Sequence, residues 1–277
     1  MSIPTALFDL TGQTALITGG ASGIGLAIAE AFVMHGGKVV VGSRTVEKVQ
    51  DAVKHLNQLD TPHAHDDSEP VAAGVALDVE SQESVDHAVK KCIDIHGGLH
   101  VVVNSAGIMC KKDTFELEAD EINQLFNIHV TGALRVSQAA GHVFREQHQG
   151  LIINIASISS FVDLTGVTAY AAAKNAMLGL TRSLANEWAK FGIRANGIAP
   201  GFVPTDINRK MIEGTDRGRR ILEHTPMARF GTSDEIAGAA VYLASPAGKF
   251  VNGHTIVVDG GYLACGIGDA VAPWAES

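Results

Sequence analysis

A chain of 277 residues is long enough for one large α/β domain or two small ones, and it can bury a sizeable hydrophobic core. Its 46% hydrophobic residues and 30 glycines are typical of a compact enzyme with many tight turns and exclude a disordered chain. The formal net charge of −9 argues against general binding to nucleic acid or to an anionic membrane, because both need a basic surface.

The cysteines and the N-terminal residues indicate the compartment. Cys92, Cys110 and Cys265 have no metal-ligand spacing, and an odd number of such cysteines is typical of reduced thiols in the cytoplasm. Residues 1–10 lack a basic segment followed by an apolar core, and no run is long enough to cross a bilayer. We therefore expect a soluble, cytoplasmic protein with no nucleic-acid or membrane partner.

The first predicted elements surround a glycine-rich turn. Residues 14–17 have the pattern of a buried strand and residues 24–32 that of a helix. Gly19 and Gly23 lie between the two, and Gly25 lies at the start of the helix. Glycine lets the backbone turn tightly and lets a pyrophosphate approach the N-terminus of a helix. The turn is therefore a candidate phosphate site, with a tight turn that binds nothing as the alternative.

A second strand, at residues 38–42, runs into Ser43 and Arg44, and an amphipathic helix follows to about residue 59. Residues 60–70 are polar and contain two prolines, so we interpret them as a surface loop. His63 and His65 lie in this loop without further ligands at suitable spacing, and we predict no metal site.

The rest of the chain continues the alternation of strands and helices. Strands are expected at 71–77, 100–103, 150–155, 193–199 and 256–259. Helices are expected at 81–96, 119–146 and 169–191 and from the capping box at 232–235, with a charged irregular segment at 205–226 and a tail at 263–277. Because the strands are uniformly apolar and no linker interrupts the pattern, we predict one α/β domain, residues 1–277, with a doubly wound sheet of about seven parallel strands.

One residue pair suits acid–base chemistry. Tyr170 and Lys174 are four residues apart near the start of a predicted helix, so their side chains share one face. A free tyrosine has a pKa of about 10, and a neighbouring cation moves that pKa toward neutrality. Such a pair can exchange a proton with a carbonyl or alcohol oxygen, and Ser157, after the strand at 150–155, can hydrogen-bond the same oxygen.

The order and spacing of these motifs resemble the short-chain dehydrogenase/reductases over residues 8–262. The motifs are Thr18-Gly-x-x-x-Gly23-x-Gly25, Asp78, Asn104-Ser-Ala-Gly107, Ser157, Tyr170-x-x-x-Lys174, Pro200-Gly201 and Asp259-Gly260-Gly261. Residues 8–12 and 225–231 look like those of the gluconate and sugar-acid dehydrogenases of the family. The resemblance implies a Rossmann-type fold and an NAD(P)-dependent oxidoreductase that moves a hydride between the nicotinamide and a carbonyl or secondary-alcohol carbon.

The resemblance also implies roles for individual residues. Tyr170 would exchange the proton with the substrate oxygen, Lys174 would lower the pKa of Tyr170 and bind the nicotinamide ribose, and Ser157 would orient the oxygen. Asn104, Ala106 and Gly107 would line the adenosine and ribose side of the coenzyme. The full set that would bind the coenzyme is Gly19, Ser22, Gly23, Ile24, Gly25, Ser43, Arg44, Asp78, Val79, Asn104, Ala106, Gly107, Tyr170, Lys174, Pro200, Gly201, Val203 and Thr205.

One position departs from the family pattern. The family usually has an asparagine that helps to anchor a proton-relay water, and the matching residue here is His129. Histidine titrates near neutrality, so His129 is a candidate catalytic residue within the relay. The alternative is that its side chain only fills the space at a bulge in the helix.

The end of the strand at 38–42 bears on the choice of coenzyme. An acidic residue there would pair with the ribose hydroxyls of NAD and repel a 2′-phosphate. The chain has Ser43 and Arg44 instead, and an arginine can pair with the phosphate and stack on the adenine. This favours NADP, with NAD as the alternative.

The family uses the segment at 205–226 as a mobile lid over the substrate. Its basic residues would bind a carboxylate or phosphate, or would form a solvated face balanced by nearby acids: Arg209, Lys210, Arg217, Arg219 and Arg220. We predict a small-molecule substrate, a sugar, polyol or sugar acid, and the resemblance implies a homotetramer. The alternatives are a 3-oxoacyl thioester reductase of fatty-acid synthesis and a non-catalytic NADP-sensing regulator.

Overall fold

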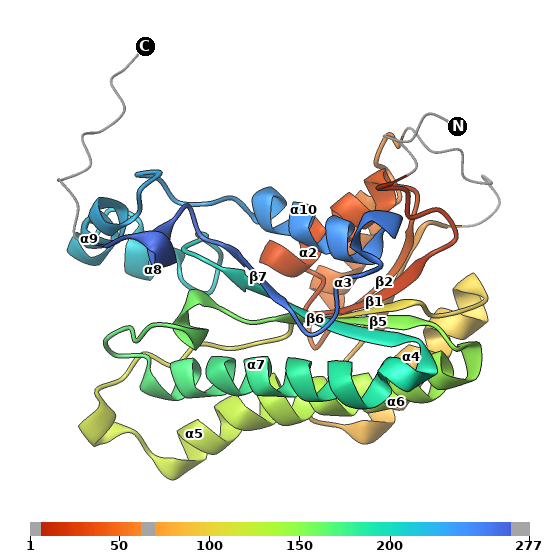
Figure 1. Cartoon of the computed structure of the whole chain (residues 1–277), viewed down its shortest axis with the longest axis horizontal. Coiled ribbons are helices and arrows are strands. Elements are labelled where there is room, and N and C mark those ends of the chain that lie inside the picture. The colour runs from red at the N-terminus through yellow and green to blue at the C-terminus, as the bar shows by residue number, and fades with distance from the viewer. Residues whose placement is uncertain (1–6, 62–69, 267–277) are drawn as a thin grey trace.

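The computed structural model describes residues 7–61 and 70–266, which form a central sheet with helices on both faces (Figure 1). His63, His65 and most of the predicted tail lie outside the described residues. Seven parallel strands are hydrogen-bonded in the order β3-β2-β1-β4-β5-β6-β7. The prediction of a doubly wound parallel α/β sheet is confirmed.

The strands are apolar because helices cover both faces of the sheet. Strands β1, β4 and β5 are buried along their whole length. β1 is central, with Ala15 opposite Val39 of β2 on one side and Val101 of β4 on the other. The strands span Thr14–Thr18 (β1), Lys38–Ser43 (β2), Ala72–Ala76 (β3), Val101–Asn104 (β4), Gly150–Ile155 (β5), Ile193–Pro200 (β6) and Thr255–Val258 (β7).

Two groups of helices cover the two faces of the sheet (Figure 1). Each group shares a hydrophobic core with the strands beneath it. The chain winds one way from β1 to β3 and the other way from β4 onward, so ligands are expected at the carboxyl ends of β1 and β4. The helices are α2 (Gly23–Met34), α3 (Val46–Leu56) and α10 (Ser233–Ala244) on one face, and α4 (Gln82–His96), α6 (Ala133–Gln147) and α7 (Thr168–Trp188) on the other.

The long helix predicted at 119–146 is interrupted. Helix α5 (Ala119–Phe126) passes into a π-helical segment, Asn127–Gly132, before α6 begins. A π turn widens the helix locally and is frequent at functional sites. Here it contains His129, which is only 3% exposed. The bulge named in the alternative interpretation of His129 is therefore present.

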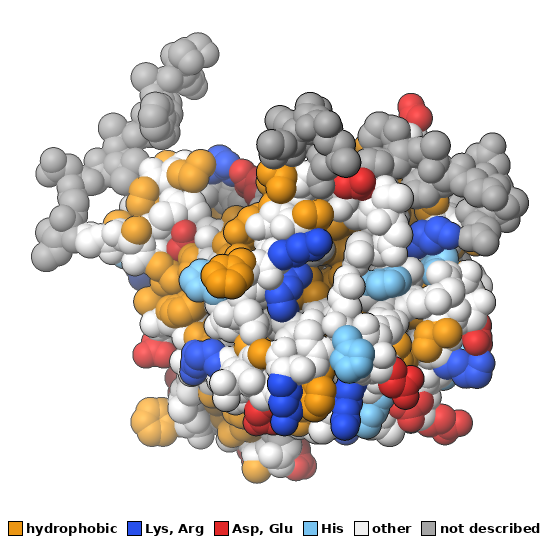
Figure 2. All heavy atoms as spheres, turned by 45° about the vertical axis from the view of Figure 1, so that its right-hand side comes forward, with side chains coloured by type: hydrophobic (Ala, Val, Ile, Leu, Met, Phe, Trp, Pro, Cys, Tyr) orange, Lys and Arg blue, Asp and Glu red, His pale blue; other side chains and the backbone are white. Residues whose placement is uncertain are grey.

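The charged segment at 205–226 contains two short helices, α8 (Arg209–Ile212) and α9 (Asp216–His224), which lie at the left of Figure 1. Acidic and basic side chains are interspersed over the lower part of the face shown in Figure 2. Across residues 7–61 and 70–266, no helix combines the length and hydrophobicity needed to cross a membrane.

Candidate active site

Close packing accounts for two glycines of the turn between β1 and α2. Gly19 has a φ of +66°, which side chains rarely allow, and a Cβ there would lie 3.0 Å from the Ala106 backbone. A Cβ on Gly25 would lie 2.4 Å from the Gly19 carbonyl oxygen. Thr18 draws the neighbouring loop against the turn, because its hydroxyl accepts hydrogen bonds from the N–H groups of Ser105 and Ala106 at 3.1 and 3.0 Å.

The start of α2 is suited to an anion. Ser22 precedes the helix and makes no side-chain hydrogen bond that would cap it. The N–H groups of the first turn and the helix dipole therefore act on the space in front of them. Ser22 and Gly23 line a cleft of about 280 Å³ that reaches the carboxyl ends of the central strands. These features fit the pyrophosphate of a dinucleotide coenzyme.

The cleft gathers all but one of the residues predicted to bind the coenzyme, and both Ser157 and His129 line it as well. The lining residues come from the glycine turn, from the ends of β2 to β6, from the π-helical segment and from the start of α7. The predicted coenzyme residues among them are Gly19, Ser22, Gly23, Ile24, Gly25, Ser43, Arg44, Asp78, Val79, Ala106, Gly107, Tyr170, Lys174, Pro200, Gly201, Val203 and Thr205.

Asn104 is the exception, and its predicted place along the adenosine side is corrected. Its side chain is buried below the cleft and donates hydrogen bonds to Asn154 Oδ1 at 2.9 Å and Ser137 Oγ at 3.1 Å. These bonds join β4 to β5 and α6. A buried amide requires such partners, so Asn104 supports the sheet beneath the site.

Ser157, Tyr170 and Lys174 converge at one end of the cleft. Ser157 follows β5, whereas the other two come from the first two turns of α7. Ser157 Oγ accepts a hydrogen bond from the Ser159 N–H at 3.1 Å, and its hydroxyl is close enough to Tyr170 to lower the pKa of the phenol. Lys174 Nζ donates to the Ile155 carbonyl at 2.6 Å and lies 5.6 Å from the centroid of the Tyr170 ring. Ser160 Oγ donates to the Lys174 carbonyl at 2.6 Å and so fixes this part of α7.

Burial shifts the pKa values of Tyr170 and Lys174 in opposite directions. It raises the pKa of Tyr170 to about 12, and the Ser157 hydroxyl opposes this effect. It lowers the pKa of Lys174 to about 7. Desolvation favours the neutral form of each side chain. Two shifted groups that face one cleft are typical of a site of proton transfer.

His129 lies beside Tyr170, with the ring centroids 5.5 Å apart in an edge-to-face arrangement. Burial, and then the charge of Lys174, lower the pKa of His129 to about 3. The prediction that His129 titrates near neutrality is therefore wrong, and its imidazole is neutral at pH 7. His129 Nε2 lies 2.8 Å from the Ile108 carbonyl oxygen and 3.2 Å from the Ile108 nitrogen; we assign the hydrogen to Nε2 because the carbonyl contact is the shorter one, which leaves Nδ1 as an acceptor.

A small cavity lies beneath this part of the cleft. Its volume is about 10 Å³, close to that needed for one water molecule, and its lining includes Asn104, His129 and Lys174. Asn104 Oδ1 and His129 Nδ1 are both buried without a hydrogen-bond partner in the described part of the chain. Gly107 makes room for the imidazole, because a Cβ there would lie 2.4 Å from His129 Cε1.

The basic residues of the segment at 205–226, which is expected from the resemblance to be a lid, have different partners. Arg209 pairs with Glu213 at 2.9 Å and Arg219 pairs with Glu223 at 2.7 Å, each one turn along its own segment. These two arginines therefore fit the alternative in which the basic residues form a solvated face balanced by nearby acids. Arg217 instead donates to the Thr165 carbonyl at 3.0 Å and joins the lid to the loop before α7.

Several lining residues escaped the sequence analysis, most of them next to predicted ones. Ile108 and Met109 directly follow the motif at 104–107, and this position could have identified them as lining residues. No sequence motif marks Asn208. Its side chain accepts a hydrogen bond from the Thr205 N–H at 2.8 Å and so shapes the start of the lid. The full set is Leu77, Glu80, Ser105, Ile108, Met109, Ile128, Ile155, Ala156, Asp206, Ile207 and Asn208.

A doubly wound sheet with a glycine turn at one end of its cleft and a Ser–Tyr–Lys set at the other defines a dinucleotide-dependent oxidoreductase. The model of a family described as enoyl-(acyl carrier protein) reductase matches residues 19–263. The chain belongs to the short-chain dehydrogenase/reductase family, as the resemblance predicted, and it is an NAD(P)-dependent enzyme acting on CH–OH or C=O groups.

The relatives cover almost the whole chain. The 2-dehydro-3-deoxy-D-gluconate 5-dehydrogenase of Dickeya dadantii (strain 3937) is 36% identical over 263 residues, which are 93% of this chain and 98% of that protein. The 5-keto-D-gluconate 5-reductase of Escherichia coli (strain K12) is 36% identical over 257 residues, with the same two coverages. A solved structure of gluconate 5-dehydrogenase from Burkholderia cenocepacia J2315, in complex with NADP and tartrate, has a TM-score of 0.86 and 33% identity over 94% of this chain and 98% of that chain.

Proposed function

We propose that this protein interconverts a keto group and a hydroxyl group of a sugar acid with NADP(H) as coenzyme. The observation that carries the proposal is the single cleft that joins the glycine turn to Ser157, Tyr170 and Lys174. The names of the relatives support a gluconate-type substrate. They do not support the alternative of a 3-oxoacyl thioester reductase.

The residues at the inner end of the cleft handle the proton. When bound, the coenzyme supplies or accepts the hydride at its nicotinamide. In the reducing direction, Tyr170 gives its hydroxyl proton to the carbonyl oxygen while Ser157 hydrogen-bonds that oxygen. The ammonium of Lys174 lowers the cost of the phenolate that results, against the effect of burial. In the oxidising direction the phenolate takes the proton back.

His129 takes the place of the family's asparagine in the proton path behind Lys174. Because its imidazole is neutral, it acts as a hydrogen-bond acceptor at Nδ1 for a water in the small cavity, and not as a titrating base. We expect His129→Asn to keep more turnover than His129→Ala, since only the asparagine supplies polar atoms. Equal turnover and unchanged pH–rate profiles in both variants would contradict this role.

The choice of NADP rests on the end of β2. Arg44 is exposed and lines the cleft directly after Ser43, at the end of β2, and the end of this strand is where Rossmann-type folds bind the adenosine ribose. A guanidinium there pairs with a 2′-phosphate, and the Ser43 hydroxyl adds a neutral donor. The NADP bound in the Burkholderia relative supports the same choice.

The protein is further proposed to act as a cytoplasmic homotetramer. A groove of about 600 Å³ between α4, α6 and the C-terminal end of α7 is lined by Trp188, Phe191 and His142, among others. Aromatic side chains on such a surface suit packing against a second copy of the chain. Analytical ultracentrifugation of the purified protein tests the tetramer, and a monomer at micromolar concentration would contradict it.

A spectrophotometric screen tests the reaction. Gluconate, 5-keto-D-gluconate, 2-dehydro-3-deoxy-D-gluconate, polyols and 3-oxoacyl thioesters are offered with each coenzyme in its matching redox state. We expect turnover on a sugar acid with a higher kcat/KM for the phosphorylated coenzyme. Tyr170→Phe should abolish turnover but retain NADPH binding. Turnover confined to thioesters, or full activity of Tyr170→Phe, would overturn the proposal.

A further inference from the structure

An ion pair connects the coenzyme side of the cleft to the lid. Lys48 lies in the first turn of α3, and its Nζ is 3.8 Å from Oδ2 of Asp206, at the start of the lid. Both side chains are exposed, at 55% and 77%. Such a surface pair is weak and exchanges readily for a better partner. Asp206 itself lines the cleft, so this bridge stands at the cleft mouth.

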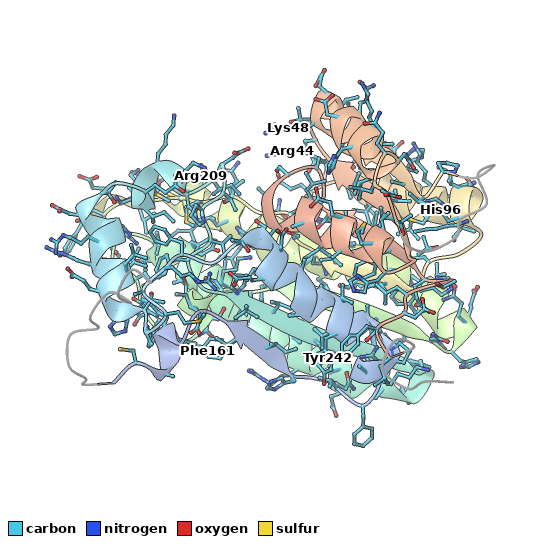
Figure 3. All side chains as sticks on the ribbon, turned by 90° about the horizontal axis from the view of Figure 1, so that it is seen from above. Arg44, Lys48, His96, Phe161, Arg209 and Tyr242 are labelled. Carbon is cyan, nitrogen blue, oxygen red and sulfur yellow. The ribbon has the colours of Figure 1, made fainter. Side chains whose placement is uncertain are left out.

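Lys48 is also close in the chain to the proposed 2′-phosphate site. It follows Arg44 by four residues, and Figure 3 labels both at the end of α3 that faces the lid, with Arg209 on the lid side. Thr45 begins α3 without a side-chain hydrogen bond to the helix, so the N–H groups of the first turn are not capped there. A phosphate next to Arg44 would therefore lie near an uncapped helix start and near a flexible ammonium.

Several acidic residues lie near Lys48 at this end of the cleft. Glu47 is exposed in the same turn of α3, and Asp78 and Glu80 line the cleft from the end of β3. Within residues 7–61 and 70–266, however, Asp206 is the carboxylate that Lys48 pairs with. A dianionic phosphate attracts the ammonium more strongly than a single exposed carboxylate does.

Resting on the proposed use of NADP, we propose that Lys48 is a second determinant of coenzyme choice, shared between Asp206 and the 2′-phosphate held by Arg44. The lid carboxylate and the phosphate compete for one ammonium. NADP therefore loosens the bridge between the lid and α3, whereas NAD, which lacks the phosphate, leaves the bridge intact. Asp206 acts against the phosphorylated coenzyme by occupying Lys48.

Coenzyme binding alone tests the inference, without knowledge of the substrate. NADPH and NADH are titrated by nicotinamide fluorescence against the wild type, Lys48→Met, Asp206→Asn and the double variant. We expect Lys48→Met to weaken NADPH binding about tenfold, as the loss of a charge-assisted contact does, with a change below about twofold for NADH. Asp206→Asn should tighten NADPH binding, and this gain should vanish in the Lys48→Met background.

Two controls separate the possible outcomes. Lys54→Met removes the same charge about 9 Å further along α3 and should leave both affinities unchanged. Arg44→Met tests the proposed function itself, because NADPH should then lose its advantage over NADH. If Arg44→Met has this effect and Lys48→Met does not, the inference is overturned and the function stands. An equal gain from Asp206→Asn with and without Lys48 would also overturn the sharing of the cation. A wild type that prefers NADH would instead refute the NADP proposal.

Discussion

Replacing the buried Lys174 by methionine should stabilise the protein near neutral pH while it abolishes turnover. Burial lowers the pKa of Lys174 from 10.5 to about 7. This difference corresponds to about 5 kcal/mol of unfavourable free energy for burying the charged amine. Methionine has a similar length and no charge, but it leaves the Ile155 carbonyl without its donor, which costs about 1–3 kcal/mol. We therefore expect a net gain of about 2–4 kcal/mol at pH 6.5.

The gain in the free energy of unfolding of Lys174→Met should disappear as the pH rises. Between pH 7 and 10.5 the unfolded chain binds a proton at Lys174 that the folded protein does not bind. The free energy of unfolding of the wild type therefore increases with pH across this window, and the methionine variant lacks this increase. Relative to the wild type, the variant should lose about 5 kcal/mol over the window and be the less stable protein at its upper end.

Urea unfolding followed by circular dichroism measures this difference at pH 6.5, 8 and 9.5. Equal protein concentrations and the absence of coenzyme keep association and binding from shifting the curves. Lys54→Met, on the exposed side of α3, controls for the loss of a positive charge and should show no such pH dependence. If the free energies of Lys174→Met and the wild type run parallel from pH 6.5 to 9.5, Lys174 is not held in its neutral form by burial.

Substitutions at three further positions, one of them tested with a double variant, have defined outcomes. His129→Asn should lessen the loss of stability between pH 6.5 and 3, measured by urea unfolding, because in the wild type a buried imidazole with a pKa of about 3 resists protonation there. Gly107→Ala should lower the free energy of unfolding by about 1–3 kcal/mol by pressing on the imidazole, and Gly107→Ala/His129→Ala should recover it. Glu235→Ala should lower the free energy of unfolding by about 1 kcal/mol at pH 7, because it removes half of the capping box of α10. Arg229 helps to lower the pKa of Glu235 to about 2, so this loss should shrink as the pH falls from 4.5 toward 2, as thermal unfolding would measure.

The fold could be predicted because each strand has its own local pattern. Runs such as residues 101–103 are apolar on both sides, which only a sheet covered on both faces explains. The glycine turn, Ser157 and the Tyr170–Lys174 pair were found in the same way, from short spacings. The bulge at His129 follows only from the family resemblance, because no local pattern marks residues 127–132, whose partners are the distant loop at Ile108 and Val79.

Long-range packing also accounts for the two errors in the predicted site. Asn104 belongs to the family motif, but whether its amide faces the cleft or the core depends on the buried partners Asn154 and Ser137. His129 was expected to titrate near pH 7 because histidine does so in water. Its pKa depends on burial and on Lys174, which is 45 positions away in the chain, and no local pattern carries that information.

The shifts of Tyr170 and Lys174 have one cause and act together on catalysis. Burial opposes the phenolate as well as the ammonium, so each charged form becomes acceptable only beside the other. The pH dependence of turnover therefore reflects the burial of both groups. Tyr170 has a pKa of about 12 even with Lys174 in place, and Lys174→Met removes the neighbouring amine whose protonated form can stabilise the phenolate. It follows that any residual oxidation by Lys174→Met should rise steadily up to pH 10, whereas the wild type should level off at lower pH, where the phenolate forms beside the ammonium.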